Sequence, residues 1–180
     1  MDNGASSYRR FLDGDEKGLE ELLNLYGKNL VYFINGYVNN ISLAEDIMED
    51  TFMELIVHKH RFRGESSVKT YLFTIARNKS LNYIKKNKRY EELTSDIEDI
   101  KRLEDVIIKT EMQKNIQRAL GNIKSDYSVV LKLLYFEDMS YDEIGHIIKK
   151  SSRQIKNLAY RARLALKEEL IKEGIEYEVW

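Results

Sequence analysis

The chain of 180 residues contains no proline, and this absence constrains its fold more than any other feature. Proline ends or kinks helices, so a chain without it has no such block to long helical segments. Apolar residues recur over long segments at the three- and four-residue spacing of a helix, and no segment alternates as a half-buried strand does. The sequence therefore predicts an all-α protein.

Composition narrows the class of protein further. With 43% hydrophobic residues the chain can bury cores, and its length suits one domain or two small ones. It has no cysteine, which excludes disulfides and thiolate metal sites. Residues 1–18 lack the apolar run of a signal peptide, and no stretch approaches the roughly 20 apolar residues of a membrane span. We therefore expect a soluble protein of the cytoplasm.

Charge is strongly segregated along the chain, although the formal net charge is only −1. Residues 13–54 carry a net charge of −8, and residues 58–89 carry +9. Residues 90–105 then carry −5, and residues 149–167 carry +7 without a single acidic residue. For any one block, a solvated helix face is an open alternative. Two basic blocks divided by an acidic stretch nevertheless predict two contacts with one polyanion.

The acidic stretch also divides the chain. Residues 90–105 combine weak periodicity with many charges, which favours a linker. The division predicts an N-terminal domain over residues 1–89 and a C-terminal domain over residues 106–180. We expect two small helical domains joined by a flexible acidic linker.

The basic block at residues 149–167 has the pattern of one amphipathic helix. Its apolar residues form one stripe, made of Ile155, Leu158, Ala159, Ala162 and Leu166. Polar residues face the other way, namely Arg153, Lys156, Asn157, Tyr160 and Arg163. Ser151 or Ser152 is the expected N-cap.

A shorter helix is predicted just upstream, because Ser140 and Glu143 have the spacing of a capping box ahead of three isoleucines. Only two or three residues around 149–151 separate the two helices. Two helices, a tight turn and a basic second helix are typical of a helix-turn-helix. Its second helix enters the DNA major groove, where Arg and Lys meet phosphate or guanine and Asn meets adenine. The alternative is a bundle helix with a solvated basic face.

The N-terminal domain has an acidic row and a basic segment. Asp46, Asp50 and Glu54 repeat at four-residue intervals on one helix face, where like charges repel. A basic partner surface would compensate that repulsion, and a solvated acidic face is the alternative.

Downstream, residues 62–67 form a polar, glycine-containing loop. A helix follows, with an apolar face of Leu72, Ile75, Ala76 and Tyr83 and many cations elsewhere. Cations follow a phosphate backbone, rings stack on unpaired bases, and Asn or Ser in a pocket can hydrogen-bond an extruded base.

Three segments in order resemble one known family. They are "AEDIMEDTFMEL", "YLFTIARNKSLNYIKKNKR" and "MSYDEIGHIIKKSSRQIKNLAYRARLALKEEL". Together they are similar to the bacterial RNA polymerase sigma factors of the extracytoplasmic-function (ECF) group. The resemblance implies that residues 1–89 bind core polymerase and recognise and melt the −10 promoter element. It implies that residues 106–180 read the −35 element, and that the linker passes through the RNA path of the polymerase.

The resemblance and the charged faces together give three candidate sites. The polymerase-binding residues are Asp46, Asp50 and Glu54. The −10 DNA-binding residues are Phe62, Arg63, Gly64, Glu65, Ser66, Ser67, Arg77, Asn78, Lys85 and Lys86. The −35 DNA-binding residues are Ser152, Arg153, Lys156, Asn157, Tyr160 and Arg161. The implied partners are core polymerase, through its β′ clamp helices and β flap, promoter DNA and an anti-sigma factor.

Some residues depart from the pattern of the family. Tyr71 stands where Trp is common, and Lys149 and Lys150 occupy a turn where Gly is common. The turn must therefore avoid the left-handed conformation or strain a lysine. Gly145 replaces the usual Ala, which costs up to about 1 kcal/mol of helix propensity.

Two other classes of function stay open at this point. A stand-alone helix-turn-helix regulator, with the N-terminal half as sensor or dimer module, accounts for residues 149–167 but leaves the block at 58–89 without a role. A metal-dependent nuclease would use the carboxylates of the acidic row, but no candidate base or nucleophile lies nearby. We expect no catalytic residue, metal, cofactor or small-molecule substrate.

Overall fold

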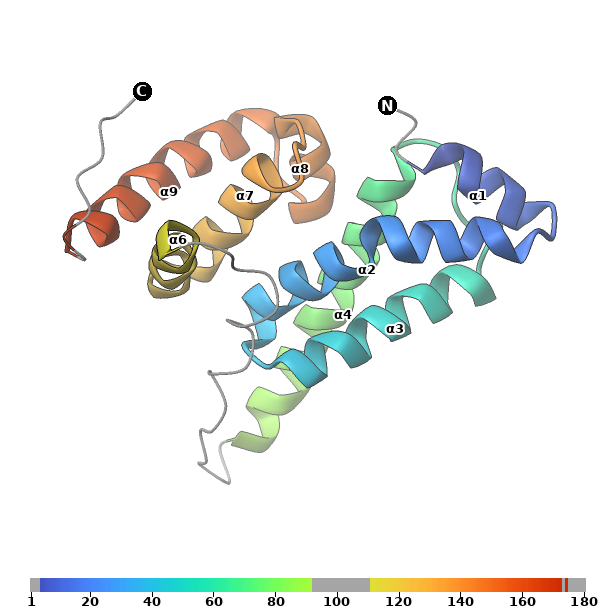
Figure 1. The fold of residues 1–180 in the computed structure, drawn as a ribbon, viewed down its shortest axis with the longest axis horizontal. Coiled ribbons are helices and arrows are strands. Elements are labelled where there is room, and N and C mark those ends of the chain that lie inside the picture. Colours follow the sequence, from blue (N-terminus) through green and yellow to red (C-terminus); the bar gives the residue numbers. More distant parts are fainter. Residues whose placement is uncertain (1–3, 92–110, 173, 175–180) are drawn as a thin grey trace. The chain divides into compact units, whose positions relative to one another are not determined.

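The computed structural model describes residues 4–91, 111–172 and 174, and all regular structure within these ranges is helical (Figure 1). This confirms the all-α prediction. The predicted linker over residues 90–105 lies outside the described residues except for its first two residues, which form the end of a helix.

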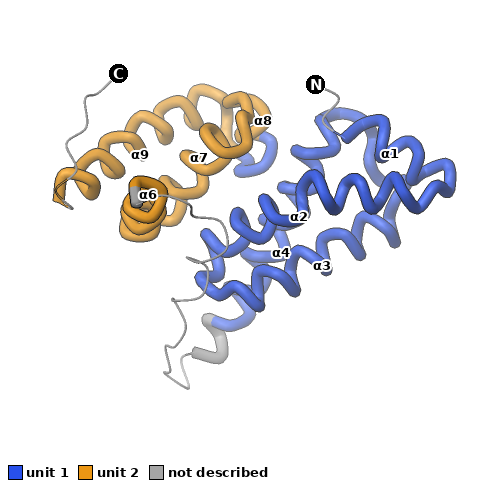
Figure 2. Tube along the Cα trace, in the orientation of Figure 1, with its two compact units in different colours: residues 1–98, 146–149 blue, residues 99–145, 150–180 orange. Residues whose placement is uncertain are grey.

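The chain divides into two compact units, coloured separately in Figure 2. Unit 1 comprises residues 1–98 and 146–149, and unit 2 comprises residues 99–145 and 150–180. The domain ranges 1–89 and 106–180 remain a prediction, because most of the stretch between them lies outside the described residues.

Unit 1 contains the helices α1 (Ala5–Leu12), α2 (Glu16–Val38), α3 (Ile41–Val57) and α4 (Val68–Glu91). The long α2 packs against the other three, and α3 also packs against α4. The rings of Phe33 on α2 and Phe73 on α4 are both buried, with their centroids 5.0 Å apart. Aliphatic side chains from α2, α3 and α4 complete this core, including Leu22, Leu30, Ile34, Leu55 and Leu72.

Local signals in the sequence start two of these helices. Asp15 caps α2 by accepting a hydrogen bond from the Lys17 amide at 3.0 Å, and Asn40 caps α3 by accepting one from the Leu43 amide at 2.9 Å. Such side-chain acceptors satisfy amide groups that have no partner within the first helical turn.

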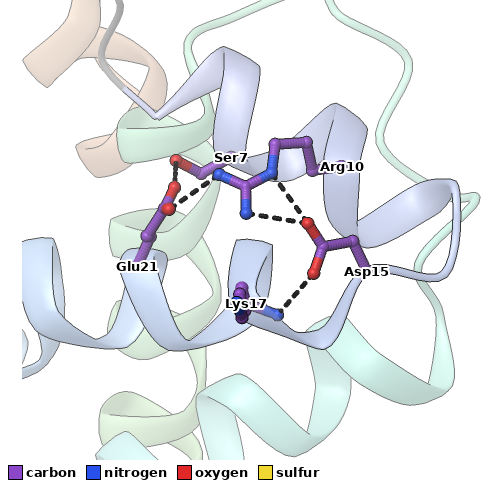
Figure 3. A network of polar contacts seen from close by, with 5 residues as sticks. All are labelled: Ser7, Arg10, Asp15, Lys17 and Glu21. Carbon is purple, nitrogen blue, oxygen red and sulfur yellow. Dashed lines mark hydrogen bonds and ion pairs between the residues drawn. The ribbon is translucent and has the colours of Figure 1, made fainter.

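The first helix, α1, is held on α2 by a polar network (Figure 3). The Arg10 guanidinium donates to Asp15 at 2.7 and 2.9 Å and to Glu21 at 2.7 Å. The Ser7 hydroxyl donates to Glu21 at 2.8 Å. The two helices approach so closely that a Cβ on Gly18 would lie 2.3 Å from the Ser7 carbonyl oxygen. Gly18 is therefore needed for this approach.

Unit 2 is built mainly from α6 (Glu111–Asn122), α7 (Ser125–Tyr135) and α9 (Ser152–Lys172), which pack together. The helix α8 (Tyr141–Ile148) precedes α9, and its last three residues, 146–148, are grouped with unit 1. Buried Leu120, Leu131 and Ala162 join α6, α7 and α9, with partly buried residues around them.

The predicted apolar faces are largely confirmed. Ile155, Ala159 and Ala162 are fully buried on α9, and Leu158 and Leu166 are half-buried beside them. On α4, Leu72, Ile75 and Ala76 are buried as predicted. Tyr83 was grouped with them wrongly, because its side chain is 37% exposed.

Candidate functional site

The acidic row lies on α3, opposite the residues that α3 buries. Asp46 and Asp50 are exposed, whereas Ile47, Thr51 and Leu55 are buried. The third member of the row is different. The Glu54 carboxylate forms an ion pair with the Lys79 ammonium on α4 at 3.0 Å, and both side chains are partly buried. The charge of Glu54 is thus compensated within unit 1. Asp46 and Asp50 are the exposed members of the acidic row.

The loop between α3 and α4, residues 58–67, contains the first candidate −10 residues. Phe62 holds this loop against the rest of unit 1. The Phe62 ring packs edge-on against Tyr8 with centroids 5.2 Å apart, and it packs against Tyr71 at 5.1 Å. Burial raises the pKa of the Tyr71 hydroxyl, and the nearby Glu54 carboxylate raises it further. Although Tyr71 stands where Trp is common, its ring is thus in contact with the loop through Phe62.

The middle of the 58–67 loop faces solvent. Arg63, Gly64 and Glu65 are exposed, and Gly64 has a φ of 74°, which glycine adopts without steric penalty. Ser66 is half-buried, and its hydroxyl donates to the Ser67 carbonyl at 3.3 Å. This short tip therefore presents polar groups outward, as do the exposed His60 and Arg61 before Phe62.

Ser67, which was predicted to bind −10 DNA, also has a structural function. Its hydroxyl oxygen accepts a hydrogen bond from the Thr70 amide at 3.1 Å and lies 2.9 Å from the Thr70 hydroxyl. Ser67 therefore caps α4 and fixes where the loop ends.

The candidate residues on α4 differ in exposure. Lys85 and Lys86 are exposed, as expected for cations that follow a phosphate backbone. Arg77 and Asn78 are half-buried. Within the described part of the chain, the buried Nε of Arg77 has no hydrogen-bond partner. A buried donor of this kind gains most from an added acceptor.

Both helices of the helix-turn-helix begin with a capping box. The Ser140 amide donates to the Glu143 carboxylate at 2.9 Å, and the Glu143 amide donates to the Ser140 hydroxyl at 3.2 Å, which confirms the prediction. The same reciprocal pair joins Ser151 and Gln154, at 2.8 and 3.3 Å. Ser151, and not Ser152, is therefore the N-cap of α9, and the S-x-x-Q pattern was the available signal.

The turn between α8 and α9 strains a lysine. Lys149 has a φ of 60°, in the left-handed region, and the Lys150 amide donates to the Gly145 carbonyl at 3.1 Å. A Cβ on Gly145 would lie only 2.6 Å from the Lys150 carbonyl oxygen. Gly145 is thus required by the close return of the backbone, which corrects its interpretation as a simple loss of helix propensity.

The exposed face of α9 carries the candidate −35 residues. Arg153, Lys156, Asn157, Tyr160 and Arg161 are all exposed, and Ser152 is half-buried. The aromatic member of this set, Tyr160, is 62% exposed. The structure thus presents three cations, an amide and a phenol along one helix, which are the groups that meet phosphates and base edges in a major groove.

Arg163, which was also predicted to point outward, is held by two tyrosines. Its guanidinium donates to the Tyr135 hydroxyl on α7 at 2.7 Å and to the Tyr141 hydroxyl at 3.3 Å. These hydrogen bonds to the tyrosine hydroxyls, first that to Tyr141 and then that to Tyr135, raise the pKa of Arg163. Nothing in the local sequence pattern indicated this bridge, because Tyr135 lies 28 residues away.

Among the described residues, no group of three or more His, Cys, Asp or Glu side chains is placed to hold a metal ion. No described helix combines the length and the apolar character needed to cross a membrane.

Comparison with known proteins gives two family matches and several relatives. Residues 22–90 match the model of sigma-70 region 2, and residues 113–166 match that of sigma-70 region 4. The RNA polymerase sigma factor YlaC of Bacillus subtilis is 27% identical over 169 residues, which cover 89% of this chain and 96% of YlaC. The ECF RNA polymerase sigma factor SigM of the same bacterium is 26% identical over 163 residues, which cover 89% of this chain and 99% of SigM.

Solved structures agree with these matches. The sigma factor RpoE of Bartonella quintana, crystallised with the anti-sigma factor NepR, aligns with a TM-score of 0.74 and 26% identity over 86% of this chain and 97% of that one. CnrH, solved in complex with the cytosolic domain of CnrY, aligns with a TM-score of 0.65 and 17% identity over 94% of this chain and 96% of that one, which supports the fold alone.

Proposed function

The chain belongs to the sigma-70 family of RNA polymerase sigma factors, in its ECF group, and we propose that it directs core polymerase to promoters by contacting them with two separate basic surfaces. One observation carries this proposal. Each basic surface, on α4 and on α9, lies within a separate match to a sigma-70 region. The alternative of a stand-alone helix-turn-helix regulator accounts only for the second match.

Docking on core polymerase is the task of α3. Asp46 and Asp50 present exposed carboxylates on one face, and they meet the clamp helices of the β′ subunit. Glu54 contributes less to this contact, because Lys79 already compensates its charge. Unit 2 meets the β flap.

Recognition and melting of the −10 element is the task of the 58–67 loop and α4. The loop tip, residues 63–66, and Asn78 form polar contacts with a base that leaves the duplex, and Lys85 and Lys86 follow the phosphates. Capture of the base offsets a few kcal/mol of lost stacking and pairing.

Recognition of the −35 element is the task of α9. Its exposed Arg153, Lys156, Asn157, Tyr160 and Arg161 enter the major groove, and the amide group of half-buried Ser152 lies at the positive end of the helix. Arg163 supports the helix from the side through Tyr135 and Tyr141.

The protein acts in the cytoplasm, where it makes and breaks no covalent bond itself. An anti-sigma factor restrains it, by analogy with the Bartonella RpoE, which was crystallised with NepR. The acidic stretch at residues 90–105 follows the RNA path of the polymerase and resembles nucleic acid in charge.

Run-off transcription across genomic fragments tests the proposal and yields the promoter. We expect specific transcripts with purified core polymerase and this protein together, and none with either alone. Sequence-specific DNA binding of full strength without core polymerase, combined with no stimulation of transcription, would favour the stand-alone regulator and overturn the proposal.

A further inference from the structure

Helix α1 has no place in the proposed function so far, and it lies outside the match to sigma-70 region 2, which begins at residue 22. Its inward face is nevertheless built for contact. Ser7, Tyr8 and Phe11 are buried, although the helix is only eight residues long. Helix α1 packs against α2, and its buried side chains also reach a second element.

That second element is the 58–67 loop. The Tyr8 hydroxyl donates a hydrogen bond to the Lys59 carbonyl, 51 residues away in the sequence. The Tyr8 ring also receives the edge of Phe62, at 5.2 Å and an interplanar angle of 85°. One buried side chain, 3% exposed, therefore holds the loop at two points.

Neighbouring contacts strengthen the same connection. The Lys59 ammonium lies 5.7 Å from the centre of the Phe11 ring, in the geometry of a cation–π contact. On its other side, Phe62 packs against Tyr71 of α4 at 5.1 Å. The rings of Tyr8, Phe62 and Tyr71 thus form a continuous row from α1 through the loop to α4.

Helix α1 is itself fixed, so it can support the loop. Arg10 and Ser7 bind Glu21 on α2, and the absence of a side chain at Gly18 lets the two backbones meet. The middle of the loop is exposed, because Arg63, Gly64 and Glu65 face solvent. The loop is anchored at Lys59, at Phe62 and at the cap Ser67, and its tip projects between these anchors.

We infer that Tyr8 is a positioning residue for promoter melting, which acts by holding the 58–67 loop so that its tip is ready to capture an unpaired base. The inference rests on the proposed function of that loop. Tyr8 reaches the loop with its buried hydroxyl and ring and needs no contact with DNA. A loop without this support would have to be ordered when the base arrives, and ordering a chain segment opposes binding.

The experiment uses the full chain with core polymerase and a promoter duplex that carries 2-aminopurine in the −10 element. Tyr8→Phe removes only the hydroxyl, and Tyr8→Leu removes the ring as well. Tyr127→Phe in unit 2 is the control of the same chemistry, at a half-buried tyrosine away from the loop. The readouts are the rate of promoter opening, the affinity for core polymerase, the affinity for a −35 duplex in the presence of core, and hydrogen exchange of the amides at residues 60–66.

We expect Tyr8→Phe to slow opening by about fivefold, the scale of one net hydrogen bond. Tyr8→Leu should slow it by tenfold or more, and exchange at residues 60–66 should accelerate. Core affinity, −35 affinity and the thermal midpoint of Tyr8→Phe should match those of Tyr127→Phe. If Tyr8→Leu does not fold, Tyr8→Phe decides the matter alone. Opening at the wild-type rate by Tyr8→Phe, or an equal loss of core affinity, overturns the inference.

Variants of the loop tip separate this inference from the proposed function. Arg63→Ala and Ser66→Ala act at the tip directly, without touching Tyr8. If they slow opening and Tyr8→Phe does not, only the role of Tyr8 is wrong. If the tip variants also open promoters at the wild-type rate, the loop has no role in melting, and the proposed function of the loop fails with it.

Discussion

Glu54 on α3 and Lys79 on α4 form an ion pair, with 3.0 Å between carboxylate and ammonium. The pair connects the acidic row, proposed to dock on polymerase, with the basic helix, proposed to bind DNA. Both side chains are partly exposed, at 38% and 27%, so the pair contributes at most about 1 kcal/mol to stability. Its main consequence is electrostatic, because it sets Glu54 apart from the other acids of the row.

The first prediction follows from this difference. Asp50→Asn and Asp46→Asn should each weaken the affinity for core polymerase by about three- to tenfold, mostly through slower association at low salt. Glu54→Gln should have a smaller effect, since its charge is already compensated. Binding kinetics with immobilised core polymerase measure this, and Glu168→Gln at an exposed position in unit 2 is the control. An effect of Glu54→Gln as large as that of Asp50→Asn would contradict the prediction.

The second prediction concerns Lys156 on α9, which is exposed. If its ammonium contacts a phosphate, Lys156→Ala should reduce the slope of log affinity against log salt by about 0.9. The measurement is a salt titration of holoenzyme binding to a −35 duplex. Lys172→Ala removes the same charge at the end of α9, where Lys172 pairs with Glu169 at 2.6 Å, and should leave the slope unchanged. An identical slope for both variants removes Lys156 from the interface.

The third prediction compares two helical glycines in unit 2. An alanine at Gly145 places its Cβ 2.6 Å from the Lys150 carbonyl oxygen, so Gly145→Ala should destabilise the protein by about 1–3 kcal/mol despite better helix propensity. Gly121 on α6 has open space, and Gly121→Ala should stabilise by up to about 1 kcal/mol. Thermal unfolding followed by circular dichroism distinguishes the two. Stabilisation by both substitutions would show that the turn relaxes without penalty.

The fourth prediction concerns pH. Burial lowers the pKa of the Lys132 ammonium on α7 from 10.5 to about 8. Between these values the unfolded chain holds a proton that the folded chain has released, so stability rises with pH through this window. Below pH 8 the destabilisation is fully present, on the order of 3 kcal/mol.

The measurement is the free energy of unfolding at several pH values from 7 to 9.5, before tyrosines ionise appreciably. Lys132→Met should abolish the rise, and Lys124→Met, at an exposed position on the same unit, should preserve it. A rise that persists in Lys132→Met assigns the titration to another group.

Features that depend on neighbours in the sequence were predictable. One example is the capping box of Ser140 and Glu143 at the start of α8, and another is the apolar stripe from Ile155 to Leu166 on α9. Each feature belongs to a single helix, where spacing alone fixes which side chains meet. The exposure of Arg153, Lys156, Asn157 and Tyr160 followed from the same periodicity, whereas Arg161 was named only from the family resemblance. Tyr83 shows the limit of this reasoning, because its position on the helix matches the apolar face but the described residues leave it 37% exposed.

Features that depend on distant residues were not predictable. Tyr8 reaches Lys59 across 51 residues, and Arg163 reaches Tyr135 across 28, so no local pattern encodes either contact. The eight residues of α1 are too few for periodicity to identify a helix that tertiary packing stabilises. Gly145 was misjudged for a similar reason. Glycine is required there because the backbone of Lys150 returns close to α8, and the sequence does not show this return.

The bridge from Arg163 to Tyr135 and Tyr141 separates two tasks along α9. The exposed side chains proposed to meet DNA, such as Lys156 and Asn157, take no part in this bridge. Under the proposed function, substitutions at those exposed positions would change which bases are read while leaving the hydrogen bonds that orient the helix intact.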